Sequence, residues 1–178
     1  MSINRRVMVF LDGSNLFWGR NQYNKENKTD LRIDYRKLID HLVGGRQIVR
    51  ATYYCSKPIP PRETQIRFID YLRKSGIQVI EKELRTRTNL ATGETKSVEK
   101  GVDVALAIDL LGMAWEGAYD DAIVISGDAD YVGAIDKVMS KGKNVEIASY
   151  RQSCSRELRG KALKTTFIDD IANIIKKT

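Results

Sequence analysis

The sequence predicts an α/β fold with a mainly parallel central sheet. Short apolar runs rich in β-branched residues alternate along the chain with segments in which apolar residues recur every three or four positions. This alternation is typical of βα units around a parallel sheet. The chain has no internal repeat, low-complexity tract or linker-like change of composition, so one domain over residues 1–178 is expected.

Five apolar runs are expected to form the strands of the sheet. In chain order they are residues 7–11, 48–54, 77–80, 122–126 and 145–149. The first run stops at Asp12-Gly13-Ser14-Asn15, where turn-forming residues end a strand.

Five segments have the apolar spacing of helices. They are residues 36–42, 64–74, 101–115, 130–139 and 168–177. The second begins just past Pro58, Pro60 and Pro61, the prolines of the chain, as expected for a stiff loop that leads into a helix. Residues 18–30 and 83–99 are expected to be surface loops, the latter with a turn at 89–94 between two extended arms.

Composition narrows the class of protein. Hydrophobic residues make up 42% and charged residues 30%, and no apolar run approaches the roughly 20 residues that cross a bilayer, so disorder and a membrane partner are not expected. Cys55, Cys154 and the single His41 cannot form a disulfide framework or a Cys/His zinc site, which favours a reducing, cytoplasmic setting. The net charge of +7 favours a polyanionic partner such as nucleic acid.

Carboxylates follow two of the expected strands. The first strand ends in Asp12-Gly13-Ser14-Asn15 and the fourth in Ser126-Gly127-Asp128-Ala129-Asp130, with a glycine in each motif that allows a sharp turn. In an open α/β sheet, ligands bind beyond the carboxyl ends of the strands. Asp103, in the first turn of the helix expected at 101–115, is a further contributor. Taken singly, each motif is also an ordinary turn or helix-cap sequence.

Asp12, Asp103, Asp128 and Asp130 together predict a site for a hard divalent cation. Like charges held close together are costly unless a cation neutralises them. An all-oxygen donor set selects Mg²⁺ or Mn²⁺ over zinc or copper, and such a cation suits phosphoryl chemistry. Without these four residues the chain has 30 basic and 19 acidic residues, a balance of +11, which predicts a basic surface around an acidic pit.

Three stretches of the chain carry a family resemblance. They are Val9-Phe10-Leu11-Asp12-Gly13-Ser14-Asn15, Lys100-Gly101-Val102-Asp103 and Val124-Ile125-Ser126-Gly127-Asp128-Ala129-Asp130-Tyr131. In order and spacing they resemble the NYN domain family, LabA-like group, of the PIN-like nuclease superfamily. The resemblance implies a three-layer α/β/α sandwich with central parallel strands in the order 3-2-1-4-5, and a divalent-metal site for RNA cleavage.

The resemblance also implies roles for individual residues. Asp12, Asp103, Asp128 and Asp130 match the acidic set of the family, and Asn15 matches the polar residue after the first aspartate. Asp12 and Asp128 are expected to bind Mg²⁺ or Mn²⁺ most directly, with the other two aspartates completing the site through water. Asn15 is expected to orient a ligand or the scissile phosphate.

Residues outside the acidic set are expected to contact RNA. They are Trp18, Arg85, Arg87, Lys100 and Ser126. Trp18 can stack on an unpaired base, a contact worth about 1 to 3 kcal/mol, whereas Phe17 is expected to pack in the core. The basic residues can follow a phosphate backbone, and Ser126 holds its loop or touches a water.

The expected function is a metal-dependent ribonuclease, an endonuclease acting on single-stranded RNA. One alternative is an RNA-binding regulatory module that retains the acidic site with little or no turnover. Another is a metal-dependent phosphatase or nucleotide hydrolase, although Asp12-Gly13-Ser14 lacks the Asp-x-Asp of phospho-aspartate enzymes. The oligomeric state, including a homo-oligomer, stays open.

Overall fold

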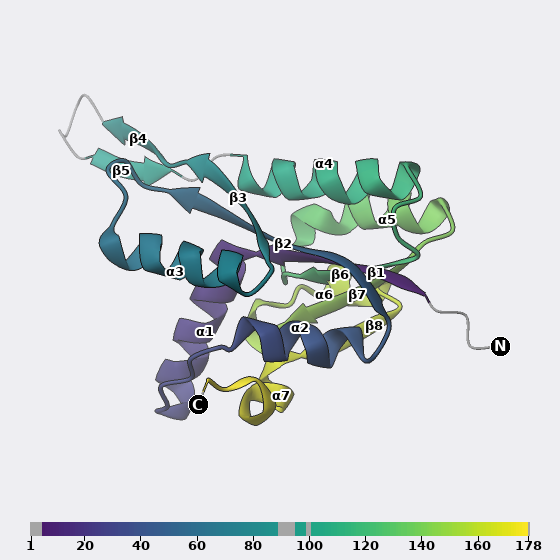
Figure 1. Cartoon of the computed structure of the whole chain (residues 1–178), viewed down its shortest axis with the longest axis horizontal. Coiled ribbons are helices and arrows are strands. Elements are labelled where there is room, and N and C mark those ends of the chain that lie inside the picture. The colour runs from purple at the N-terminus through teal and green to yellow at the C-terminus, as the bar shows by residue number, and fades with distance from the viewer. Residues whose placement is uncertain (1–4, 89–94, 99–100, 178) are drawn as a thin grey trace.

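A six-stranded parallel sheet forms the centre of the molecule (Figure 1). The computed structural model describes residues 5–88, 95–98 and 101–177. In spatial order the strands are β3 (Gln78–Glu83), β2 (Gln47–Lys57), β1 (Arg6–Asp12), β6 (Asp121–Ile125), β7 (Asn144–Ser149) and β8 (Lys164–Phe167). The predicted α/β fold is therefore confirmed, and the five expected strands follow the order 3-2-1-4-5, with β8 added at the edge.

Helices cover both faces of the sheet and give three layers (Figure 1). One face carries α1 (Gly13–Asn27), α2 (Tyr35–Val43), α3 (Glu63–Lys74) and α7 (Ile168–Ile175). The other carries α4 (Val102–Trp115), α5 (Val132–Ser140) and α6 (Arg156–Lys161). Side chains of β1 alternate between the two cores, because successive strand residues point to opposite faces of a sheet.

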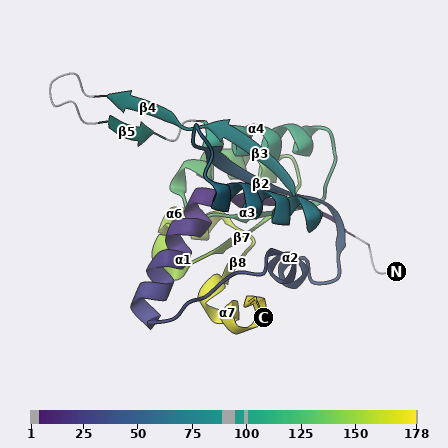
Figure 2. The ribbon, with the colours of Figure 1, turned by 60° about the vertical axis from the view of Figure 1, so that its left-hand side comes forward.

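A β-hairpin stands apart from these layers (Figure 2). Its strands β4 (Arg85–Thr88) and β5 (Thr95–Val98) pair antiparallel, as expected for two extended arms. The turn expected at residues 89–94 lies outside the described residues.

The prediction of a surface loop at residues 18–30 is wrong, because most of this segment belongs to α1, which extends from Gly13 to Asn27. The sequence does not predict this helix, because its exposed faces are polar or aromatic. Its buried positions are Gly13, Leu16 and Gly19, which form no continuous apolar stripe. The side chain of Asp12 starts the helix by accepting a hydrogen bond from the backbone N–H of Asn15.

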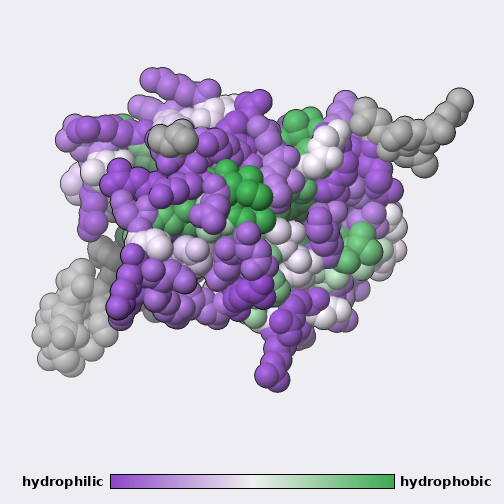
Figure 3. Space-filling view, turned by 90° about the horizontal axis from the view of Figure 1, so that it is seen from below, coloured by the Kyte–Doolittle hydropathy of each residue, from purple (hydrophilic) through white to green (hydrophobic). Residues whose placement is uncertain are grey.

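The surface seen from below Figure 1 is mostly hydrophilic, with small apolar groups between polar ones (Figure 3). Charged residues make up 30% of the chain, which matches this appearance. Among the described residues, no helix combines the length and apolar character needed to cross a bilayer.

Candidate active site

Asp12 lies at the carboxyl end of β1, with only 5% of its surface exposed. Its Oδ1 accepts hydrogen bonds from the backbone N–H of Asn15 (3.1 Å) and the hydroxyl of Ser14 (3.2 Å). Its Oδ2 accepts hydrogen bonds from the hydroxyls of Ser126 (3.0 Å) and Tyr131 (3.2 Å). Both oxygens of this buried carboxylate are therefore satisfied, and its orientation is determined from four directions.

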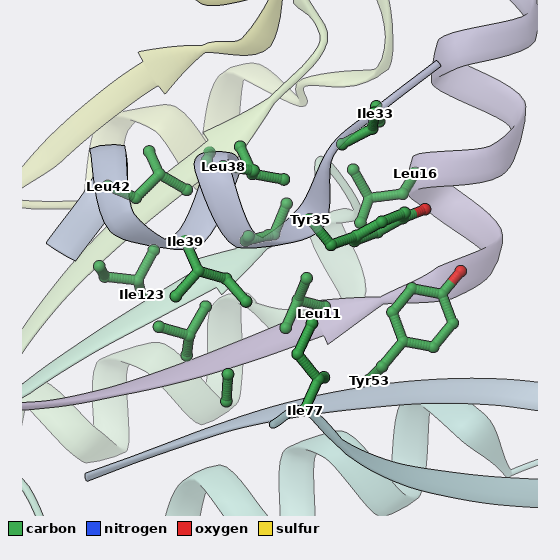
Figure 4. Packing of buried hydrophobic residues seen from close by; sticks show 14 of the residues in the cluster. Leu11, Leu16, Ile33, Tyr35, Leu38, Ile39, Leu42, Tyr53, Ile77 and Ile123 are labelled. Atoms are coloured by element: carbon green, nitrogen blue, oxygen red, sulfur yellow. The ribbon is translucent and has the colours of Figure 1, made fainter. Parts of the chain in front are cut away.

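The hydrophobic core holds the backbone on either side of Asp12. Leu11 and Leu16 are 0% and 2% exposed and belong to the core on the α1 side of the sheet. Figure 4 shows these two side chains with Tyr53 and Ile39 in that core. Because both neighbouring side chains are packed in the core, the Asp12 carboxylate cannot shift without disturbing the packing of Leu11 and Leu16.

The loop after β6 meets the first turn of α1. The backbone N–H of Gly127 donates to Oδ1 of Asn15 at 3.1 Å, and the backbone N–H of Asp128 donates to Oγ of Ser126 at 3.2 Å. Since Ser126 also donates to Asp12, the two strand ends expected from the sequence are joined by direct hydrogen bonds. The loop is therefore held in one position relative to Asp12.

Close packing explains the glycine in each acidic motif. A Cβ at Gly13 would lie 2.6 Å from Cε1 of Tyr53, and one at Gly127 would lie 2.0 Å from the carbonyl oxygen of Ser153. Neither glycine is among the described glycines with a positive φ. The expectation that they permit sharp turns is therefore wrong; glycine is needed at both positions because other groups approach the backbone too closely for a side chain.

The other three aspartates are exposed. Asp128 caps the 3-10 turn Ala129–Tyr131, where its Oδ1 accepts a hydrogen bond from the backbone N–H of Asp130 at 3.0 Å. Asp103 lies in the first turn of α4. These carboxylates are accessible to ions and ligands in solvent, in contrast to Asp12.

Tyr131 bonds to Asp12, lies in the electric field of Asp103 and Asp128, and is a site residue that the sequence does not reveal. Burial raises the pKa of its hydroxyl, and the negative charges of Asp12, Asp103 and Asp128 raise it further. The hydroxyl therefore stays protonated and donates to Asp12. A tyrosine after an acidic loop has the sequence signature of an ordinary packing residue, so only the fold reveals this contact.

The donor set of the site fits a hard divalent cation in its chemistry. Its acidic side chains offer oxygen alone, which Mg²⁺ and Mn²⁺ prefer. Over residues 5–88, 95–98 and 101–177, however, no three or more His, Cys, Asp or Glu side chains are arranged to hold a metal ion. Binding would therefore require the exposed carboxylates to adopt other rotamers.

The residues expected to contact RNA differ in their positions. Trp18 is 69% exposed on α1, and its neighbour Phe17 is 47% exposed, so the expectation that Phe17 packs in the core is wrong. Ser126 is 1% exposed and bonds with Asp12 and Asp128, so in this structure it holds the loop. Arg85 and Arg87 lie in β4. Lys100 lies outside the described residues.

A parallel α/β sheet carries a buried aspartate and exposed carboxylates beyond its strand ends, an arrangement that the nuclease-type, PIN-like domain of the NYN family accommodates. The NYN domain model matches residues 6–169, and the chain belongs to the NYN domain family. The resemblance drawn from the three motifs is thereby confirmed.

Two known proteins are similar over nearly the whole chain. The low amplitude and bright protein LabA of Synechococcus elongatus (strain ATCC 33912 / PCC 7942 / FACHB-805) is 24% identical over 173 residues, which cover 97% of this chain and 89% of LabA. A crystal structure of VPA0982, a protein of unknown function from Vibrio parahaemolyticus RIMD 2210633, superposes with a TM-score of 0.72 at 21% identity. That match covers 96% of this chain and 97% of the other, and it shows the same fold.

Proposed function

We propose that this protein is a metal-dependent ribonuclease that hydrolyses phosphodiester bonds within single-stranded RNA. The observation that carries the proposal is the carboxylate of Asp12, buried at the sheet edge and oriented by four hydrogen bonds, next to the loop that bears Asp128 and Asp130. Because Asp12 is already held in position, its charge needs no reorganisation when the substrate reacts, and only the exposed carboxylates have to turn toward the cation.

Asp12, Asp103, Asp128 and Asp130 would hold Mg²⁺ or Mn²⁺. When bound, the cation supplies positive charge that offsets the charge developing on the phosphate and promotes the ionisation of water. The Tyr131 hydroxyl stays protonated and donates a hydrogen bond to Asp12, which holds this carboxylate in position. Asn15 holds the loop after β6 through Gly127, and in this way positions Asp128.

The RNA would reach this edge over a basic surface. We assign phosphate contacts to Arg85, Arg87 and Lys100 and a stacking contact to Trp18, since the chain outside the acidic set has a balance of +11. Lys96 of β5 pairs with Arg87 of β4 and adds a third basic residue to the hairpin. Replacing Arg85, Arg87 and Lys96 together by glutamate should flatten the log-log salt dependence of RNA affinity by about two to three units. An unchanged slope would place the RNA elsewhere.

Cleavage of labelled RNA tests the proposal directly. Single- and double-stranded substrates are incubated with Mg²⁺, with Mn²⁺ and with chelator, and Asp128→Asn protein prepared in parallel controls for contaminating nucleases. Residues that act as one unit give non-additive losses. Asp128→Asn or Asp103→Asn alone should therefore remove most of the rate, and the double variant should lose little more.

A second candidate function is an RNA-binding regulatory module with little or no turnover. It is favoured by the lack of a converged metal-ligand group among residues 5–88, 95–98 and 101–177. A wild-type protein that binds RNA tightly, but cuts no RNA with either cation, would establish this function instead.

A further inference from the structure

A cavity of about 640 Å³ opens next to the acidic edge of the sheet. Gly13 and Ser14, which directly follow Asp12, form part of its wall. The rest of the wall comes from α1, from the start of α2, from the carboxyl end of β2 and the segment after it, from α3, and from Leu84 after β3. Its volume falls in the range of about 300 to 1,000 Å³ that is typical of sites for small molecules and cofactors.

Aromatic rings form the inner wall of this pocket. Tyr35, Tyr53 and Phe68 all line it, and their centroids lie 5.5 to 5.6 Å apart in edge-to-face contacts. Tyr35 and Tyr53 belong to the core shown in Figure 4. Because each ring rests against the other two, this wall is rigid and presents flat apolar surface.

Two exposed rings stand at the solvent side of the same pocket. Phe17 and Trp18 line it from α1 and are 47% and 69% exposed, with their rings 5.3 Å apart in an edge-to-face contact. Large exposed aromatic rings beside a pocket are available for stacking, since they make few contacts inside the protein.

The charge of the lining is positive. Arg20 and Arg62 line the pocket, and no aspartate or glutamate occurs among the described residues that line it. The guanidinium of Arg20 lies 5.4 Å from the Phe17 ring centre, and its buried Nε has no hydrogen-bond partner in the described part of the chain. Arg62 is exposed and forms no ion pair with any described residue. Flat apolar walls with unmatched cations suit a planar ring that carries a negative group.

We infer that this pocket holds one unpaired nucleobase of the RNA strand whose backbone crosses the acidic edge. The base stacks on Trp18 and is enclosed by Phe17 and Phe68, while Arg62 faces a phosphate next to it. The inference rests on the proposed RNA substrate and adds a selection step: a paired base cannot enter, so duplex RNA is excluded. It also assigns recognition to α1 and α3 and leaves bond cleavage to the aspartates.

The two tryptophans of the chain provide a matched test. Trp18 lines the pocket, whereas Trp115, 54% exposed at the end of α4, is not among its lining residues. Binding is measured in chelator, so that no strand is cut, with a short single-stranded RNA, an abasic ribose-phosphate chain of equal length and a nucleoside 5′-monophosphate. Trp115→Phe protein, in which Trp18 is the remaining tryptophan, reports stacking by fluorescence quenching.

The expected result is quenching of Trp18 by the RNA and none by the abasic chain. Trp18→Ala should weaken RNA binding by about 5- to 150-fold, which corresponds to the loss of one stacked base, and Trp115→Ala should leave it unchanged. Equal affinity of the two alanine variants, or equal binding of the RNA and the abasic chain, would overturn the inference. So would a mononucleotide that binds as tightly as the RNA, because the pocket would then serve a free nucleotide.

These outcomes are independent of catalysis. If the protein cuts RNA with Mn²⁺ but RNA does not quench Trp18, the ribonuclease proposal stands and the base pocket is ruled out. Quenching without any cleavage supports the pocket and favours the binding module.

Discussion

Asn15 and Gly127, 112 positions apart in the chain, are joined by a hydrogen bond of 3.1 Å from the backbone N–H of the glycine to Oδ1 of the asparagine. Gly127 is buried, so its N–H depends on this acceptor to be satisfied. This contact connects the first turn of α1 to the loop that carries Asp128. Together with the Ser126 hydroxyl, which bonds to Asp12 and to the backbone N–H of Asp128, it fixes how Asp128 stands relative to Asp12.

Replacing Asn15 by alanine should lower the free energy of unfolding by about 1 to 3 kcal/mol, because the N–H of Gly127 loses its partner. Urea denaturation measures this change. Asn27→Ala, at the exposed end of the same helix, is the control and should stay within about 0.5 kcal/mol of wild type. Equal stability of the two variants would show that the contact contributes nothing.

Gly127→Ala should be strongly destabilising, since the added methyl group would lie 2.0 Å from the carbonyl oxygen of Ser153. Relief requires movement of backbone, and overpacking of this kind costs about 1 to 3 kcal/mol or more. Gly133→Ala is the matched control. In α5 the new methyl would meet no atom within 4 Å, so stability should rise by about 0.5 to 1 kcal/mol. Thermal melts of both proteins check the opposite signs.

Asp12→Asn and Asp128→Asn should separate structure from metal binding. At position 12 an amide nitrogen must face groups that now donate to Asp12, so the free energy of unfolding should fall by about 1 to 3 kcal/mol. Asp128 is exposed, and asparagine caps helical turns equally well, so its variant should change stability by less than about 0.5 kcal/mol.

Both of these variants should also reduce stabilisation by Mn²⁺. If the wild type binds Mn²⁺ as proposed, this stabilisation should reach about 2.7 kcal/mol at a hundredfold excess over Kd. Differential scanning fluorimetry with and without Mn²⁺ measures the response. A wild-type melting temperature that does not change with millimolar Mn²⁺ would contradict the metal site.

The pair formed by Arg6 and Asp120 should make stability depend on pH. A hydrogen bond from the Arg6 side chain lowers the pKa of Asp120 from 3.8 to about 2. Because the folded pKa is the lower one, the stabilisation is complete above about pH 4 and is lost as the pH falls toward 2. Both side chains are partly exposed, so it amounts to at most about 1 kcal/mol.

Asp120→Asn tests this dependence. The variant should be less stable than wild type at pH 7, and the difference should shrink on acidification to pH 3, as followed by urea denaturation. Asp30→Asn disrupts a pair with Arg32 in which both side chains are about three-quarters exposed, and it should change stability little at either pH. A constant difference for Asp120→Asn would show that the pair contributes no pH dependence.

The strands of the sheet other than β8 could be predicted from their apolar runs, most clearly where a strand is buried on both faces. Residues 7–11 of β1 are at most 1% exposed, and a short apolar run of this kind is typical of a strand in a parallel sheet. By contrast, α1 is held by its Asp12 cap and by close packing at glycines, with Gly19 near the ring of Tyr150, and neither feature has an apolar period. Helix α6 and strand β8 are short and polar and were missed for the same reason.

The candidate site was predictable in its location and not in its contacts. Strand ends in a parallel sheet must meet at one edge, so the positions of Asp12 and Asp128 followed from the chain order. The bond from Tyr131 to Asp12, however, arises from the path of a 3-10 turn, and the chemistry of the residues does not determine that path.

The position of β1 between β2 and β6 has a consequence for how the chain is made. The Ser126 hydroxyl that binds Asp12 is 114 positions further along the chain, so β1 is synthesised well before its partner strand β6. Until β6 emerges, one long edge of an apolar strand is unpaired, and such edges invite association with other chains. Fragments that end before residue 121 should therefore aggregate during translation, and sheet closure around Asp12 should be a late step in folding.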